Sequence, residues 1–167
     1  MNKTLDNTIQ KLSIWKLIIS VAICESTGIM SSLLSSAIMN PWFNSLNKPS
    51  WNPPAYIFGP VWSLLYLLMG ISLWLVWKSN KHSDKKEVAI TFFVIQLLLN
   101  FWWSLLFFKF HSPALALVDI LLLVLLILFT MIQFFPISKI AFYILIPYVF
   151  WVGFATALNY SIWLLNK

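Results

Sequence analysis

Long apolar runs constrain this chain more than any other feature. The hydrocarbon core of a bilayer is about 30 Å thick, so a helix that crosses it needs about 20 mostly apolar residues. Five runs meet that requirement, separated by short polar joints: 12–39, 55–77, 88–108, 114–135 and 140–165. We therefore predict an all-α integral membrane protein, a single bundle of five transmembrane helices forming one domain over residues 1–167.

The composition argues against other protein classes. Of the 167 residues, 60% are apolar and only 10% charged, whereas soluble domains carry about 25% charged residues and disordered chains are poor in apolar residues. All the basic residues are lysines at the ends of apolar runs, a pattern that does not predict a nucleic-acid partner. The single cysteine, Cys24, cannot form an internal disulfide, and we predict no metal site.

The lysines also predict how the bundle lies in the membrane. With five spans the chain ends face opposite sides, and eight of the eleven lysines fall on the side of the N-terminus. The positive-inside rule then places the N-terminus and the 78–87 loop in the cytoplasm, with the 40–54 loop and the C-terminus outside. The composition, rich in Leu, Ile and Lys, fits a bacterial plasma membrane.

Two acidic residues lie within the apolar runs. Glu25 falls near the middle of the first run, where a carboxylate facing lipid is costly, so it should be protonated, face other helices or line a wet cavity. Asp119 lies about one turn into the fourth run, where the helix dipole and nearby Lys109 can stabilise a charge. For both residues a structural role and a ligand-binding role remain open.

Three runs carry stripes at helical spacing. The stripe on the third run joins amides to rings: Gln96, Asn100, Trp103 and Phe107. The fifth run repeats the combination with Trp151, Ala155, Leu158 and Asn159. The first run has small residues that allow close helix packing: Cys24, Gly28, Ser31 and Ser35. Such stripes usually form packing faces, but tryptophan together with an amide on two helices suits a flat ligand with polar edges.

The 40–54 connection and three interior tryptophans add to this pattern. Four prolines and two tryptophans make residues 40–54 a stiff, aromatic segment. It forms either a lid over the mouth of the bundle or a segment that lies on the membrane surface. Most tryptophans near the ends of spans fit interfacial anchoring, whereas Trp62, Trp103 and Trp151 lie inside spans and are candidates for a ring-stacking pocket.

Motifs in the 40–54 connection and in the last four runs resemble one known family. The connection and second run read Trp42-Phe43-x-x-Leu46-x-Lys48-Pro49-Ser50-Trp51-x-Pro53-Pro54 and Phe58-x-Pro60-Val61-Trp62-x-x-Leu65-Tyr66. Later runs give Gln96-Leu97-x-Leu99-Asn100-x-x-Trp103-Ser104, Ala116-Leu117-Val118-Asp119 and Pro147-Tyr148-x-x-Trp151-x-x-Phe154-Ala155-x-x-Leu158-Asn159-Tyr160. Together they resemble the TspO/MBR family of tryptophan-rich sensory proteins, which is related to the mitochondrial translocator protein or peripheral benzodiazepine receptor.

The resemblance implies a homodimer in the lipid bilayer, with a pocket beneath the 40–54 loop. It implies porphyrins such as protoporphyrin IX as ligands, isoquinoline-carboxamide or benzodiazepine drugs as further ligands, and no covalently bound cofactor. Carried over position by position, the binding residues would be Trp51, Pro54, Phe58, Val61, Trp62, Tyr66, Asn100, Trp103, Asp119, Leu122, Trp151, Ala155 and Leu158.

The pattern and the resemblance favour one function, leave one alternative and disfavour a third. The favoured one is porphyrin binding by a tetrapyrrole sensor, scavenger or carrier. The alternative is light- and oxygen-dependent porphyrin degradation, for which Trp62 and Trp151 match the tryptophans associated with that chemistry; no conventional catalytic set is visible. Active transport is disfavoured because the spans show neither breaks nor inverted repeats. Sterol recognition is not predicted, because Lys167 lies one position too far from Tyr160 for the cholesterol motif.

Overall fold

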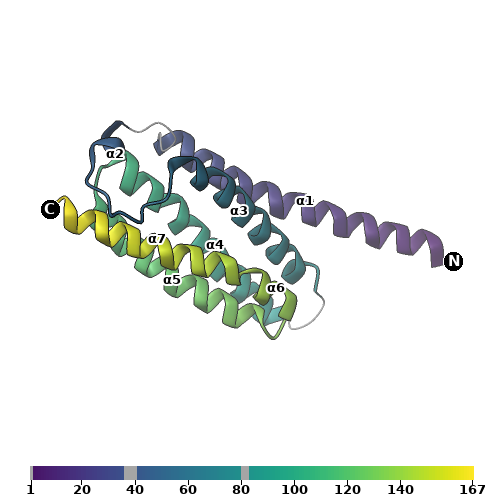
Figure 1. The fold of residues 1–167 in the computed structure, drawn as a ribbon. Helices are drawn as coiled ribbons and strands as arrows, with labels where there is room; N and C mark the ends of the chain where they lie inside the picture. The colour runs from purple at the N-terminus through teal and green to yellow at the C-terminus, as the bar shows by residue number, and fades with distance from the viewer. Residues whose placement is uncertain (1, 36–40, 80–82) are drawn as a thin grey trace.

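The computed structural model describes residues 2–35, 41–79 and 83–167, and within these ranges it contains helices and no strand (Figure 1). The elements are α1 (Asn2–Ser35), α2 (Pro41–Ser45), α3 (Ala55–Trp77), α4 (Ser83–Ser104), the π-helical segment η2 (Leu105–Lys109), α5 (Pro113–Phe134), α6 (Lys139–Ile144) and α7 (Ile146–Leu165). Residues 36–40 and 80–82, which include parts of the predicted first run and of two predicted loops, lie outside the described residues.

Five helical spans are long and apolar enough to cross a membrane in the part of the chain that the structure describes. They are 14–35, 55–77, 85–109, 113–134 and 139–165. This confirms the predicted all-α membrane fold. The spans run antiparallel in sequence order, so the two ends of the chain lie at opposite ends of the bundle, with α2 at the same end as the C-terminus (Figure 1).

Local sequence signals explain the short joints between the last three spans. Ser112 caps α5 by accepting a hydrogen bond from the Leu115 amide at 3.4 Å, and Pro113 occupies the first turn, where its missing amide hydrogen is not needed. Ser138 caps α6 in the same way, accepting from the Ala141 amide at 3.3 Å.

The fifth span contains a break that the sequence analysis did not expect. α6 ends at Ile144 and α7 begins at Ile146. Pro147 lies in the first turn of α7, and because proline has no amide hydrogen it cannot donate the bond that would continue α6 into α7. The prediction that no span is broken is therefore wrong at this point, although 139–165 still forms one span.

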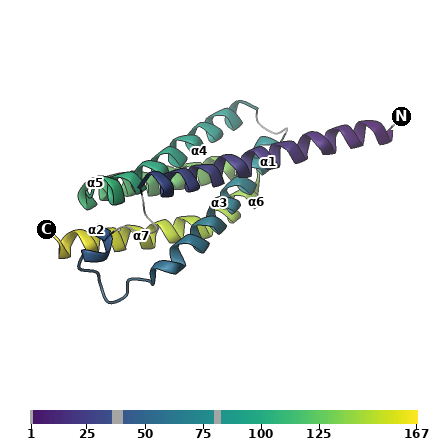
Figure 2. The same cartoon turned by 90° about the horizontal axis from the view of Figure 1, so that it is seen from above.

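Close contact between α1 and α3 sets the shape of the bundle. The two helices cross (Figure 2) and touch at two glycines. A Cβ atom at Gly70 would lie 2.6 Å from the Cα atom of Val21, and one at Gly28 would lie 2.2 Å from the ring of Tyr66. Both distances are too short for any other residue without a shift. The predicted small-residue stripe on the first run is therefore confirmed as a packing face, with Cys24, Ser31 and Ser35 buried.

Candidate ligand-binding cavity

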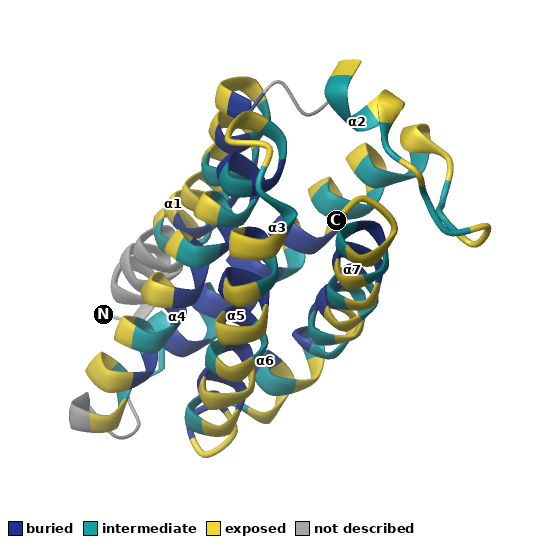
Figure 3. Ribbon diagram, turned by 90° about the vertical axis from the view of Figure 1, so that its left-hand side faces the viewer, coloured by how far each residue is buried: buried dark blue, intermediate teal, exposed yellow. Residues whose placement is uncertain are grey.

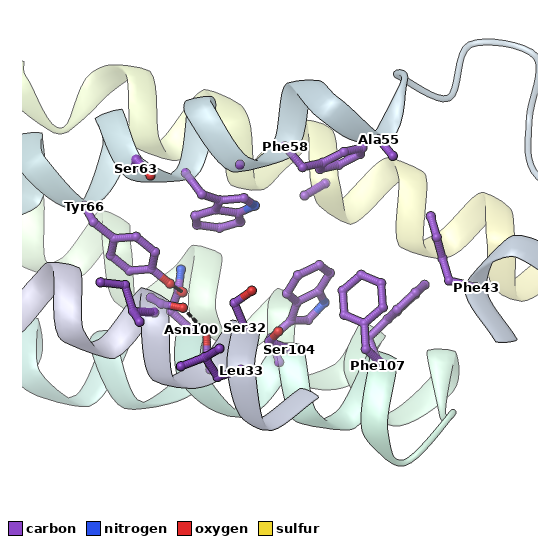
Figure 4. A pocket seen from close by; sticks show the side chains of 18 of the residues that line it. Ser32, Leu33, Phe43, Ala55, Phe58, Ser63, Tyr66, Asn100, Ser104 and Phe107 are labelled. Atoms are coloured by element: carbon purple, nitrogen blue, oxygen red, sulfur yellow. Dashed lines mark hydrogen bonds between the residues drawn. The ribbon is translucent and has the colours of Figure 1, made fainter. Parts of the chain in front are cut away.

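A cavity of about 590 Å³ lies beneath α2, with walls formed by α1, α3, α4, η2 and α7 (Figure 4). Most of its surface is apolar, and aromatic side chains form much of it. The principal rings come from Phe58, Trp62, Tyr66, Trp103, Phe107 and Phe108. Polar groups also reach it, from Glu25, Ser32, Ser63, Asn100, Ser104 and Asn159. The volume falls within the range of about 300–1,000 Å³ that is typical of small-molecule sites.

Three aromatic contacts form a continuous surface along the cavity. The centroids of the Trp62 and Tyr66 rings are 5.6 Å apart, and those of Trp62 and Trp103 are 6.4 Å apart. Trp103 continues to Phe107 at 5.7 Å, and the planes in all three pairs are inclined by about the same angle, 30° to 32°. These spacings are typical of offset aromatic pairs. The result is a wall of rings against which a flat apolar molecule can pack.

A buried chain of hydrogen bonds fixes the inner end of this wall. The Tyr66 hydroxyl donates to the Asn100 side-chain oxygen (Figure 4). The Asn100 amide donates to the Tyr148 hydroxyl at 3.0 Å, and that hydroxyl donates to Gln96 Oε1 at 2.7 Å. The chain links α3, α4 and α7 in a region away from water. Because a buried polar group left without a partner is destabilising, these four side chains hold one another in place.

A second amide orients Trp103. The indole Nε1 of Trp103 donates to Asn159 Oδ1 at 3.0 Å, and Asn159 Nδ2 donates to the Pro113 carbonyl at 2.8 Å. Asn159 on α7 therefore joins the ring wall on α4 to the start of α5. The amide and tryptophan that the sequence analysis noted on two different runs form one connected unit.

The segment 41–54, which we call the roof, is fixed at several points. The Asn166 side chain pairs with the backbone of Asn47, accepting from its amide at 2.9 Å and donating to its carbonyl at 2.8 Å. The Phe43 ring lies 5.4 Å from that of Phe108, and Trp42 stacks on His111 at 4.4 Å. Phe43 lines the cavity directly. Of the two predicted placements of this segment, the structure favours the lid.

Seven of the thirteen predicted binding residues line the cavity: Phe58, Trp62, Tyr66, Asn100, Trp103, Ala155 and Leu158. The structure brings these side chains together from α3, α4 and α7. It does not by itself test whether they contact a ligand, so their binding role stays a prediction.

The other six predicted residues lie around the cavity or away from it: Trp51, Pro54, Val61, Asp119, Leu122 and Trp151. Trp51 packs on Phe154 at 5.7 Å. Trp151 packs on Phe58 at 6.0 Å, one ring removed from the cavity, and its buried Nε1 has no hydrogen-bond partner among the described residues. Leu122 is 51% exposed on the outer surface of α5.

The remaining three predicted residues are Asp119, Pro54 and Val61. Asp119 is buried in α5, and its Oδ2 finds no hydrogen-bond partner within the described ranges. Pro54 directly precedes α3, and Val61 packs against the core of the bundle. None of the three is part of the cavity wall, and their binding role stays a prediction.

None of the predicted binding residues came from α1 or α2, yet both helices contribute to the cavity wall. Ser32, Leu33 and Phe43 line the cavity, and so does Glu25, for which lining a cavity was one of the predicted alternatives. The small-residue stripe predicted that α1 would approach another helix closely, but not which neighbouring residues would face a hollow. Among the described residues, no group of three or more His, Cys, Asp or Glu side chains could hold a metal ion.

Comparison with known proteins supplies the family. The sequence profile of the TspO/MBR family matches residues 20–164, which is most of the chain and includes every residue that lines the cavity. The chain belongs to the TspO/MBR family. Its place in the family rests on the full length of the bundle and not on a single motif.

Several TspO/MBR relatives are similar over most of their length. The tryptophan-rich protein TspO of Chlorobaculum tepidum is 39% identical over 150 residues, 90% of this chain and 95% of that protein. The protein of the same name from Archaeoglobus fulgidus is 39% identical over 155 residues, 93% of this chain and 99% of that protein. The human translocator protein is 39% identical over 123 residues, 73% of each chain.

Proposed function

We propose that this TspO/MBR protein binds a flat tetrapyrrole of the protoporphyrin IX type in the cavity beneath the roof, and acts as a tetrapyrrole sensor, scavenger or carrier. The observation that carries the proposal is the wall of inclined rings from Tyr66 to Phe107 inside a cavity of about 590 Å³. Burial of a large apolar ring system against such a wall is favourable by its area alone.

Polar groups at the cavity surface complement the edges of such a ligand. Ser32, Ser104 and Asn159 bring hydroxyl and amide groups to a surface that is otherwise ring-lined. A few polar groups in an apolar site are the usual means of orienting a ligand. The same combination suits smaller aromatic amides, so isoquinoline-carboxamide and benzodiazepine compounds should compete with protoporphyrin IX for the cavity.

A titration in the dark tests the proposal. Protoporphyrin IX is added to the purified protein, and tryptophan quenching and porphyrin absorbance are recorded for wild type, Trp62→Ala and Trp151→Ala. We expect saturable binding that Trp62→Ala weakens strongly, because Trp62 lines the cavity. Trp151→Ala should weaken it less, because Trp151 does not line the cavity and contacts the lining residue Phe58. Unchanged affinity in both variants would show that the ligand does not bind in this cavity.

A second candidate function is light- and oxygen-dependent degradation of the bound porphyrin. It is favoured by one observation: the readily oxidised rings of Trp62, Tyr66 and Trp103 lie together at the cavity wall. The porphyrin would act as its own photosensitiser, with oxygen as the oxidant. Product formation under light that is lost in Trp62→Ala would support this function, and bleaching no faster than that of free porphyrin in detergent would exclude it.

We also propose that the protein is a homodimer in a bacterial plasma membrane, with its N-terminus in the cytoplasm and the roof and C-terminus outside. The orientation rests on the lysine distribution. Single cysteines introduced near each chain end, labelled in intact cells with a membrane-impermeant maleimide, test it: the C-terminal site should react and the N-terminal site should not. Light scattering of the purified protein tests the dimer.

A further inference from the structure

The cavity wall between α1 and α3 is formed by residues that also face outward. On α1 these are Ile29 and Leu33, which are 57% and 70% exposed, together with Ser32. On α3 they are Tyr56, which is 78% exposed, and the exposed Gly59 and Ser63. We call these six residues the slot. Side chains that line a cavity and are also exposed on the outside of the bundle mark an opening through its wall.

The slot ends where α1 and α3 make contact. Gly28 lies against the Tyr66 ring, and one helical turn further along α3 Gly70 lies against the Val21 backbone. Beyond this contact, toward the roof, the labelled side chains of Ser32 and Leu33 on α1 and Ser63 on α3 come from opposite sides of the cavity (Figure 4). A Cβ atom at Gly59 would meet nothing within 4 Å. The slot is therefore open at the level of the cavity and closed below it.

The roof, unlike the slot, closes the cavity through contacts that a ligand would have to displace. Its backbone is paired to Asn166 at the end of α7, and Phe43 packs on Phe107 and Phe108 above the cavity. A ligand that arrived from water along the bundle axis would have to displace these contacts. A ligand that arrives through the slot displaces none of them.

The slot lies between two helices that are apolar enough to cross a membrane. All six slot residues lie within the apolar spans 14–35 and 55–77, and none of them carries a charge. We infer that the cavity is loaded sideways from the bilayer through the slot, and that its ligands are aromatic molecules dissolved in lipid. This inference rests on the proposed function, since it concerns how the same cavity is reached.

Two glycines provide a matched pair of variants for the test. Gly59→Phe places a ring in the slot, whereas Gly153→Phe places the same ring on the exposed face of α7; both positions have open space around a Cβ atom. Each protein is reconstituted in vesicles of phosphatidylcholine and phosphatidylglycerol. Association of protoporphyrin IX is followed by stopped-flow tryptophan quenching, and dissociation by dilution into empty vesicles.

We expect Gly59→Phe to slow both the association and the dissociation of protoporphyrin IX, each by about tenfold, because a barrier in the path acts in both directions. Gly153→Phe and Asn166→Ala, which frees the roof, should load at the wild-type rate. Ser63→Leu, which narrows the slot with a smaller side chain, should give a weaker slowing of the same kind even if Gly59→Phe fails to fold.

Two results would overturn the inference. Wild-type rates in both Gly59→Phe and Ser63→Leu would show that the slot is not the path, and faster loading in Asn166→Ala would place the path beneath the roof. These outcomes leave the proposed function intact, because saturable quenching would persist. Absence of saturable quenching in the wild-type protein would instead remove the proposed function, and the slot proposal with it.

Discussion

The two halves of this bundle are built from the same long helices, but one half has a closely packed core and the other encloses a cavity. In the half near α6, which we call the base, Met69, Val76 and Ala89 are fully buried, and Phe93 stacks on Phe134 at 5.8 Å. In the half near α2, the roof half, the same helices surround a cavity of about 590 Å³. Figure 3 marks the buried positions of these helices in dark blue and the exposed ones in yellow. A continuous helix can therefore serve as core at one end and as pocket wall at the other.

Side-chain size at the crossing of α1 and α3 accounts for the difference. Glycines at 28 and 70 let the two helices touch at the crossing. Toward the roof α3 carries the large rings of Phe58 and Trp62, and a separation wide enough for those rings leaves space beside them.

Gly70→Val should destabilise the base most. The new Cβ would lie 2.6 Å from the Val21 Cα atom, a backbone atom that cannot move without moving α1. We expect a loss of about 3 kcal/mol, the upper range for overpacking. Thermal unfolding can be followed by reaction of buried Cys24 with a fluorogenic maleimide. Gly153→Val, which meets nothing within 4 Å, is the control; equal losses in both variants would mean that the contact is unimportant.

Tyr148→Phe should break the polar link between the halves. The variant removes the acceptor of the Asn100 amide and the donor to Gln96, leaving two buried groups without partners. We expect a loss of about 2 kcal/mol, measured by the same unfolding assay. Tyr143→Phe, at an exposed tyrosine on α6, should change little. A neutral Tyr148→Phe would show that the hydrogen-bond chain does not stabilise the fold.

Two leucines from the predicted binding set can distinguish a ligand bound in the cavity from one bound on the outer surface of the bundle. Leu158 lines the cavity and is 6% exposed, whereas Leu122 is 51% exposed on α5. We expect Leu158→Ala to weaken protoporphyrin IX binding about tenfold, equivalent to about 1.4 kcal/mol, and Leu122→Ala to leave it unchanged. Porphyrin absorbance titration measures both. A larger loss of affinity in Leu122→Ala than in Leu158→Ala would show that the ligand binds on α5.

Asn166→Ala should loosen the roof alone. It removes the two hydrogen bonds to the Asn47 backbone, with an expected local effect of about 1 kcal/mol. Hydrogen exchange of residues 44–52 should become faster, while exchange in the base and the reactivity of Cys24 stay as in wild type. Faster exchange throughout the protein would mean that the roof and the base are one cooperative unit.

The five spans could be predicted because hydropathy acts over whole helices. The apolar runs are long enough to specify the five spans without help from any single residue. α2 was not predicted because five residues, Pro41–Ser45, are too few to show a period. The break before Pro147 was missed because proline is also tolerated in the first turn of a helix, which is where it lies in α7.

The cavity was only partly predictable because it depends on how helices cross. Asn100 and Trp103 could be proposed from their spacing on one helix face, and both line the cavity. Ser32 and Leu33 line it because α1 and α3 diverge beyond Gly28, a geometry that no spacing on α1 specifies. Leu122 was included through the resemblance alone; its side chain is half exposed on α5, and its binding role stays a prediction.

The most direct test of the account is a structure of the protein in lipid with protoporphyrin IX bound. We predict that the macrocycle lies inside the cavity of the roof half, in contact with Trp62 and Trp103 and beneath Phe43, while the base is unchanged. A macrocycle on a lipid-facing surface such as α5 around Leu122, or an empty cavity at saturating ligand, would contradict the account.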